Sequence, residues 1–271
     1  MLDKKKSGYK LTGTKAETLK ELENIGYNVP SVFFFTVKKW KISSNEIIDE
    51  IINKYVDVKL AIRSSTKAED TEDSSMAGAF ESLLNVTCDN KSIRKAVNKV
   101  IASFDDDISN QILVQPMVTN VAMSGVIMSH VLDDGSPYHV FNYDDKTGLT
   151  DTVTSGSTIN KTVYIYNGVD KEDFDSKYLK VALDLVRSLQ KTFLNIPIDI
   201  EFAINKSFEV YLLQVRKITT INKWNEVVNK QVSSRMLFLK EYVGTLIKRR
   251  LNLYGDRTLL GFMPDWNPAE M

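Results

Sequence analysis

The sequence predicts a fold of the α+β class. The prediction rests on the order in which helical and strand patterns occur along the chain. Helical and strand patterns share the first third of the 271 residues, β-branched and aromatic runs dominate the middle, and the end is helical in pattern. Strands and helices do not alternate regularly, as they would in a doubly wound parallel sheet. With 43% hydrophobic residues, the chain is long and apolar enough to bury a sizeable core.

Two capping boxes mark helices in the first third. Thr14 and Glu17 fit the first, and apolar residues at helical spacing follow as far as Gly26. Ser43 and Glu46 fit the second, before a run rich in isoleucine. The other elements expected here are strands over 32–35 and 59–62, a polar loop over 63–75, and a helix over 92–104.

The middle of the chain is punctuated by turn formers that separate strand-like runs. The expected strands cover 112–118, 125–131, 138–143, 162–166, 198–204 and 208–215. An amphipathic helix is expected over 179–193, and a second helical pattern runs from 224 to 251. Near the end, Phe262 and Trp266 have no obvious packing partner in the sequence, so we expect the chain to be part of a longer protein.

Composition argues against several classes of protein. The 35 basic and 35 acidic residues balance, so no nucleic-acid partner is expected. No apolar run reaches about 18 residues, so no membrane span is expected. Cys88 is the one cysteine, which rules out an intrachain disulfide, and the amino terminus has no signal-peptide pattern. These features predict a cytoplasmic protein.

Two cationic residues are candidates for binding phosphate, although neither a P-loop nor a dinucleotide motif occurs. Lys15 stands at the first helical position after Gly13, where the helix terminus attracts anions. Arg63 stands where a buried strand is expected to end, before the small residues of 74–78. The alternatives are a solvated lysine beside a cap and a surface loop with one paired arginine. His130 and His139 are expected to be structural.

Polar residues alternate on two successive expected strands. Asp199 and Glu201 share one face of the first strand, and Gln214 and Arg216 share one face of the second. A hairpin would bring these four side chains together. Carboxylate and amide oxygens suit Mg²⁺, and an arginine can neutralise charge on a transferring phosphoryl group. The alternative is a sheet face with a cross-strand ion pair between Glu201 and Arg216.

These residues recur, in the same order, in a known family. The motifs are Val29-Pro30, Arg63-Ser64-Ser65 with Glu69-Asp70 and Ala77-Gly78, Val114 to Val118 with Ser124-Gly125-Val126, and Asp199-Ile200-Glu201 with Leu213 to Arg216. Over residues 8–219 the chain resembles the N-terminal domain of phosphoenolpyruvate synthase and pyruvate phosphate dikinase. The resemblance implies an ATP-grasp fold, with subdomains 1–114 and 115–219 sandwiching the nucleotide and a helical extension over 220–271.

The resemblance also assigns roles. It implies that Lys15 and Arg63 bind phosphates and that Arg216 acts on the transferring group. The implied nucleotide contacts further include Ser75 and Gly78, in a loop over the phosphates, and Gln115, Met117 and Val118, in a linker beside the adenine. The implied ligands of Mg²⁺ are Glu201 and Gln214, with Asp199 nearby.

In this family the phosphoryl acceptor is a histidine on a separate domain, which is absent from this sequence and is therefore an expected partner. Where the synthases have a Gly-Leu-Gly-Glu stretch, this chain has a different segment at 142–148, which leaves Asp144 or Asp151 as candidates for the acidic role. That segment and the sequence end are similar to the subgroup of capsular polysaccharide genes that includes L-glutamine kinase. The resemblance implies cleavage of ATP to AMP and phosphate, with phosphorylation of the glutamine amide. The alternatives are a pyruvate-dependent synthase and a nucleotide-binding module without catalysis.

Overall fold

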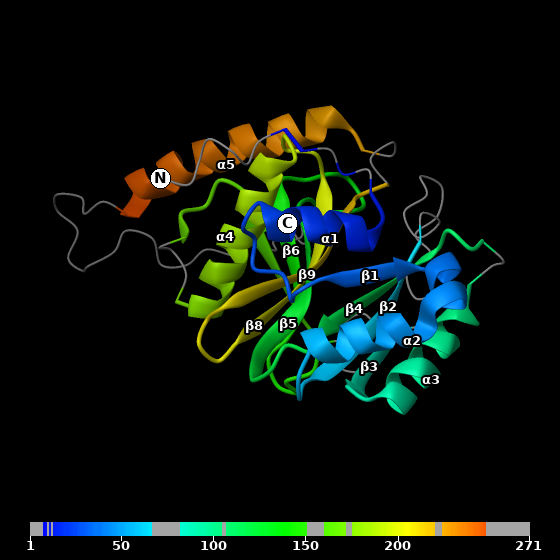
Figure 1. Cartoon of the computed structure of the whole chain (residues 1–271). Coiled ribbons are helices and arrows are strands. Elements are labelled where there is room, and N and C mark those ends of the chain that lie inside the picture. The colour runs from blue at the N-terminus through cyan, green and yellow to red at the C-terminus, as the bar shows by residue number, and fades with distance from the viewer. Residues whose placement is uncertain are drawn as a thin grey trace.

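The computed structural model describes residues 8–9, 11, 13–66, 82–104, 107–150, 160–171, 175–219 and 224–247. Within these ranges the chain forms two antiparallel sheets with helices packed on them, which confirms the predicted α+β class (Figure 1). The helices are α1 (Lys15–Asn24), α2 (Val37–Lys54), α3 (Asn90–Ile101), α4 (Lys177–Thr192) and α5 (Glu226–Ile247). The strands are β1 (Phe33–Thr36), β2 (Lys59–Ser65), β3 (Ser82–Thr87), β4 (Gln111–Pro116), β5 (Val121–Met128), β6 (Tyr138–Asp144), β7 (Lys161–Tyr166), β8 (Ile198–Asn205) and β9 (Val210–Lys217).

The four-stranded sheet has the order β1-β4-β2-β3, and α2 and α3 cover one of its faces (Figure 1). Leu60 and Ile62 of β2 are fully buried in the core that this face forms with the two helices. Because side chains alternate along a strand, Arg63 and Ser65 project from the opposite face. That second face looks toward the rest of the molecule and contributes to the candidate site.

The five-stranded sheet has the order β7-β6-β5-β8-β9, and α1 and α4 pack on one of its faces. Ile200 and Phe202 of β8 lie in the core shared with these helices, together with Leu19 of α1 and Leu189 of α4. The strand period puts Glu201 on the opposite face. This sheet therefore has one apolar face covered by helices and one face that carries polar side chains.

Local signals for α1 are confirmed. Thr14 and Glu17 form the predicted capping box, since the Thr14 side chain accepts from the Glu17 backbone N–H and the Glu17 side chain accepts from the Thr14 N–H. The helix ends at Asn24, two residues before Gly26, whose φ of 90° suits a residue without Cβ.

Several elements differ from the prediction, and among them β5 covers Val121–Met128 rather than the expected 125–131. Helix α2 begins at Val37 rather than after Ser43, and Ser43 lies at a break inside it with φ −134° and ψ 43°. Strand β2 continues through Ser65, so the expected loop over 63–75 is wrong for its first three residues, and 67–81 lie outside the described residues. Strand β3 was not predicted, because its alternating pattern is short and half-exposed.

Two stretches of chain connect the sheets. One leads from α1 to β1 through residues 25–32, and the other leads from β4 to β5 through residues 117–120. The boundary between the two expected subdomains, at residue 115, stays a prediction. In the first stretch three consecutive carbonyl oxygens accept hydrogen bonds from side chains of the four-stranded half.

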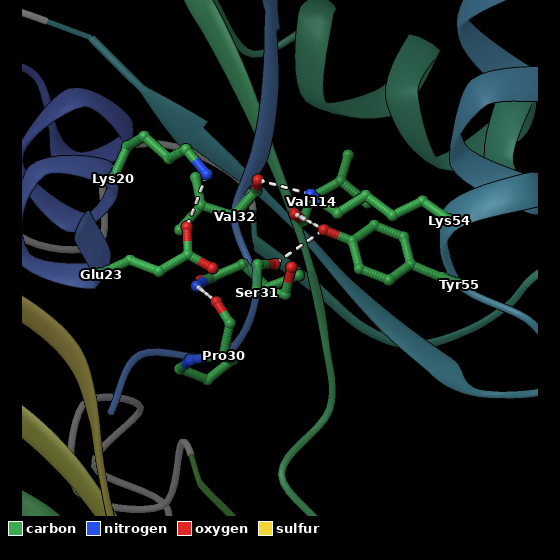
Figure 2. Close-up of polar contacts among 9 residues, drawn as sticks. Lys20, Glu23, Pro30, Ser31, Val32, Lys54, Tyr55 and Val114 are labelled. Carbon is green, nitrogen blue, oxygen red and sulfur yellow. Dashed lines mark hydrogen bonds and ion pairs between the residues drawn. The ribbon is translucent and has the colours of Figure 1, made fainter. Parts of the chain in front are cut away.

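Figure 2 shows two of these bonds: Tyr55 donates to the Ser31 oxygen at 2.7 Å, and Lys54 donates to the Val32 oxygen at 2.9 Å. The third is from the Gln115 amide to the Pro30 oxygen, at 2.6 Å. We call this set the crossing clamp.

Helix α5 follows Trp224, whose indole N–H donates to the Leu132 oxygen at 2.6 Å and whose ring lies 5.4 Å from the His130 ring. None of the helices in the described part of the chain combines the length and apolar character needed to cross a lipid bilayer.

Candidate functional site

Strands β8 and β9 form the hairpin on which the sequence prediction depends. In their register Asp199 lies opposite Arg216 and Glu201 lies opposite Gln214. Directly opposed residues of an antiparallel pair place their side chains on one face. The hairpin therefore brings the two acidic side chains, the amide and the guanidinium together, as predicted.

Asp199 and Arg216 form a bidentate ion pair. The Arg216 Nε donates to Asp199 Oδ1 at 3.2 Å, and Nη2 donates to Oδ2 at 2.9 Å. Burial raises the pKa of the Asp199 carboxyl above its ordinary value, Arg216 opposes the rise, and Glu201 adds to it. Because both oxygens of Asp199 are engaged, this carboxylate orients Arg216. The ion pair across the hairpin that the alternative interpretation named is present, but its acid is Asp199 and not Glu201.

Glu201, which lies opposite Gln214, also lies beside a side chain from the other sheet. Arg63 Nη1 is 3.9 Å from Glu201 Oε2, and Arg63 is only 8% exposed. The Nε of Arg63 is buried and has no hydrogen-bond partner among the described residues. A buried guanidinium N–H without an acceptor is costly, so this atom suits an anionic ligand. The site thus spans both sheets.

The donor set fits a hard divalent cation in part. Glu201 offers a carboxylate that is 21% exposed, and Gln214 offers an amide oxygen. Mg²⁺ takes oxygen ligands and commonly keeps water and phosphate oxygens in its remaining positions. Asp199 is committed to Arg216, and the described residues contain no group of three or more His, Cys, Asp or Glu side chains placed to hold a metal. Glu201 and Gln214 are therefore the residues that fit.

Lys15 lies at the first position of α1, next to a helix terminus where two of the N–H groups are already engaged by side chains. The Ala16 N–H donates to Ser65 Oγ at 2.8 Å, and the Glu17 N–H donates to Thr14 Oγ1 at 3.3 Å. Anion binding here would fall to the Lys15 side chain, not to these two N–H groups. Ser65 and Arg63 project from the same face of β2, so Lys15 starts close to Arg63.

The linker expected beside the adenine leaves β4. The Gln115 side chain is 2% exposed and belongs to the crossing clamp, and the Met117 N–H donates to the Lys59 oxygen at 2.8 Å. Val118 packs with Val121, Ala203 and Leu213. Backbone groups and an apolar surface, rather than the Gln115 side chain, are what this linker offers to a base.

Some candidate residues cannot be placed, and others were missed. Ser75, Gly78 and Asp151 lie outside the described residues. Asp144 caps a turn, since Oδ1 accepts from the Lys146 and Thr147 N–H groups and Oδ2 accepts from the Thr147 hydroxyl. Asn142 was not predicted. It pairs with Val126, which pairs with Glu201, and its buried Oδ1 has no partner among the described residues.

Two curated proteins are similar in sequence. The uncharacterized phosphotransferase YvkC of Bacillus subtilis is 26% identical over 232 residues, which cover 66% of this chain and 27% of that protein. The probable phosphoenolpyruvate synthase of Archaeoglobus fulgidus is 26% identical over 224 residues, which cover 65% of this chain and 29% of that protein. The chain therefore spans less than a third of the length of the curated relatives it matches.

Two solved structures have a broadly similar arrangement. The D-alanine-D-alanine ligase of Coxiella burnetii has a TM-score of 0.47 at 10% identity, over 84% of this chain and 60% of that one. The RimK domain protein ATP-grasp of Sphaerobacter thermophilus has a TM-score of 0.42 at 12% identity, over 83% of this chain and 63% of that one.

The sequence also matches the family described as pyruvate phosphate dikinase, AMP/ATP-binding domain, over residues 42–177, which is half of the chain. This stretch holds Arg63 and the linker at 115–118, whereas Lys15 and the β8–β9 hairpin lie outside it. The match is to a domain that binds adenine nucleotides, and the candidate site has cationic and oxygen-bearing side chains suited to that ligand. This chain belongs to the pyruvate phosphate dikinase AMP/ATP-binding domain family.

Proposed function

We propose that this chain binds Mg²⁺–ATP between its two sheets and supplies the ATP-cleaving half of a phosphotransferase. The observation that carries the proposal is the meeting of Arg63 from β2 with Glu201 from β8, beside Gln214, in a place where Arg63 Nε has no acceptor among the described residues. Triphosphate oxygens would satisfy that N–H. Family membership supplies the class of nucleotide.

Each side chain has a separate task in this proposal. Arg63 and Lys15 hold phosphate oxygens, and Arg216, oriented by Asp199, neutralises charge that develops on the transferring group. Glu201 and Gln214 would hold Mg²⁺, which supplies charge neutralisation and links phosphate oxygens. Such chemistry depends on positioning and electrostatics, so it needs no nucleophile from this chain.

The acceptor is proposed to lie outside this sequence. Support comes from the resemblance of the sequence to dikinases that pass the phosphoryl group to a histidine on a separate domain, and from the segment at 142–148, which is similar to that of L-glutamine kinase. The proposed overall reaction converts ATP, water and glutamine to AMP, phosphate and glutamine phosphorylated on its amide nitrogen. Product trapping with glutamine or with pyruvate distinguishes this acceptor from the pyruvate-dependent alternative.

The site is tested by two substitutions in the protein that also carries the histidine domain, or with that domain supplied in trans. We expect Glu201→Ala and Arg216→Ala each to slow AMP formation by about 10²- to 10³-fold, because single charge-stabilising groups have effects of this size. Glu209→Ala is a matched control, since Glu209 lies on the same hairpin but is exposed and bonded to Asn205.

Three results would contradict parts of the proposal. Unchanged AMP formation in both site variants would remove the assigned roles of Glu201 and Arg216. ATP that binds but is never cleaved, even with the histidine domain present, would favour a nucleotide-binding module without catalysis. Failure of Mg²⁺–ATP to bind at all would remove the site.

A further inference from the structure

The first turn of α1 is fastened to the four-stranded sheet by a buried cluster of side chains. Thr14 Oγ1 donates to Gln111 Oε1 at 2.7 Å, and Gln111 Nε2 donates to Glu17 Oε1 at 2.7 Å. Ser65 Oγ accepts from the Ala16 N–H at 2.8 Å. Ser65 and Gln111 lie directly opposite each other in the β2–β4 register, so their side chains bond to α1 from the same place on the sheet.

This cluster does more than cap the helix. The capping box is already closed by the bonds between Thr14 and Glu17 themselves. Gln111 adds a second bond to each member of the box, using its carbonyl as acceptor for one and its amide as donor for the other. A side chain with one acceptor and one donor is required for this, which glutamine provides and neither glutamate nor methionine does.

The cluster also joins the two halves of the molecule. The body of α1 packs with α4 on the five-stranded sheet through Leu19 and Leu22, whereas its first turn is bonded to the four-stranded sheet. Lys15 belongs to that first turn. Ser65 lies two residues from Arg63 on the same face of β2, a separation of about 7 Å along the strand. The cluster therefore determines the position of Lys15 relative to Arg63.

We propose that Gln111 and Ser65 are positioning residues that hold the first turn of α1 so that Lys15 and Arg63 meet the same phosphate group. This inference rests on the proposed function, because it assigns the two residues a part in nucleotide binding. Neither residue is proposed to touch the nucleotide. Gln111 and Ser65 contribute to Mg²⁺–ATP affinity by positioning Lys15. Their substitution should therefore have no effect on affinity once Lys15 is removed.

A double-mutant cycle on Mg²⁺–ATP affinity tests this dependence. Calorimetry gives the Kd for the unsubstituted chain, Gln111→Met, Lys15→Met and the double variant. We expect Gln111→Met to weaken binding about tenfold, because a displaced Lys15 would lose its hydrogen bond to a charged phosphate oxygen. In the Lys15→Met background the same substitution should change Kd by less than twofold. Ser65→Ala should behave in the same way, and should also speed hydrogen exchange at the Ala16 amide.

The control is Gln190→Met, which removes a half-buried side-chain amide of α4 that is bonded to His139 of β6 at 2.9 Å. It should lower Tm and leave Kd unchanged. Effects of Gln111→Met and Lys15→Met that simply add in free energy, or an unchanged Kd in Gln111→Met, would overturn the positioning role while ATP binding and the proposed function stand. A chain that binds no Mg²⁺–ATP would overturn the proposed function and the positioning role with it.

Discussion

Arg63 combines deep burial with incomplete hydrogen bonding. Its contact with Glu201 is 3.9 Å long, which is outside good hydrogen-bond geometry, and its buried Nε has no acceptor among the residues that the structure describes. A fold selected for stability alone would have little reason to keep such a side chain, because removing a guanidinium from water is expensive unless its N–H groups are satisfied. This combination supports the proposal that Arg63 binds an anionic ligand.

Substitution of Arg63 therefore separates stability from binding. In Arg63→Met we expect the free energy of unfolding of the free chain to change by less than about 1 kcal/mol, because the lost contact is weak and an unsatisfied buried N–H disappears. The rise in Tm caused by Mg²⁺–ATP should vanish. Thermal unfolding with and without nucleotide measures both quantities. A large loss of stability in the free chain would show that Arg63 is structural.

At the scale of elements, the crossing clamp holds the stretch between α1 and β1 against the four-stranded half. Tyr55, at the end of α2, donates to the oxygens of Ser31 at 2.7 Å and Val114 at 3.3 Å (Figure 2). Burial raises the pKa of the Tyr55 hydroxyl well above its ordinary value, so the group remains a donor at neutral pH. The clamp joins α2, β4 and the chain crossing at one point.

Removing this hydroxyl should weaken the whole fold. We expect Tyr55→Phe to lower the free energy of unfolding by about 1–2 kcal/mol, because the part-buried Ser31 oxygen loses its close donor and the bond to the Val114 oxygen, which is buried, is lost as well. Tyr164→Phe is the matched control: Tyr164 is 60% exposed on β7, and its substitution should change stability by less than about 0.5 kcal/mol. Denaturant titration measures both. Equal effects of the two variants would contradict a special role for the clamp.

At the scale of the whole molecule, the 35 basic and 35 acidic residues balance, so at neutral pH no large net charge destabilises the folded chain by self-repulsion. The protonation of a buried histidine is then expected to make a measurable contribution to the pH dependence of the free energy of unfolding. His139 of β6 is 1% exposed, and its Nε2 lies 2.9 Å from the Gln190 oxygen of α4. Its pKa is lowered to about 4, mainly by burial. Arg187 of α4 and His130 contribute to this lowering of the pKa, whereas the hydrogen bond to Gln190 opposes it.

The sign of the resulting pH dependence follows from these pKa values. The unfolded chain takes up the His139 proton near pH 6.5, but the folded chain takes it up only near pH 4. The stability associated with neutral His139 is therefore present above pH 6.5 and is lost as the pH falls toward 4, to a limit of about 3 kcal/mol. Denaturant titrations between pH 7 and pH 4 measure this loss. His139→Gln should flatten that part of the profile, and an unchanged slope would contradict the assignment.

Sequence patterns predicted the elements whose causes are local. The capping box at Thr14 and Glu17 and the alternation of Asp199 and Glu201 are complete within a few residues, and the structure confirms the helix and the hairpin that they predict. The two-sheet α+β architecture and the family agree with the predicted ATP-grasp class. The roles assigned to individual site residues stay predictions.

Local sequence patterns gave wrong predictions, or none, where the structure at a residue is set by contacts with residues far away in the sequence. Arg63 and Ser65 were predicted to begin a loop because they are polar. They instead continue β2, because Glu201 contacts Arg63 and the first turn of α1 contacts Ser65 from distant parts of the chain. Helix α2 starts before the predicted cap because Val37 and Trp40 are buried against the four-stranded sheet. Gln111 carried no signal in the sequence, since its partners are 94 and 97 residues away.

The sequence by itself determined which side chains carry charge and which of them share a face of the β8–β9 hairpin, because the strand period is two and the hairpin turn is short. Only the tertiary structure decided which of them meet: that Asp199 holds Arg216, that Arg63 reaches Glu201, and that Lys15 starts beside β2. The physical reason is that burial and hydrogen bonding select partners by distance in space, which local sequence patterns do not contain.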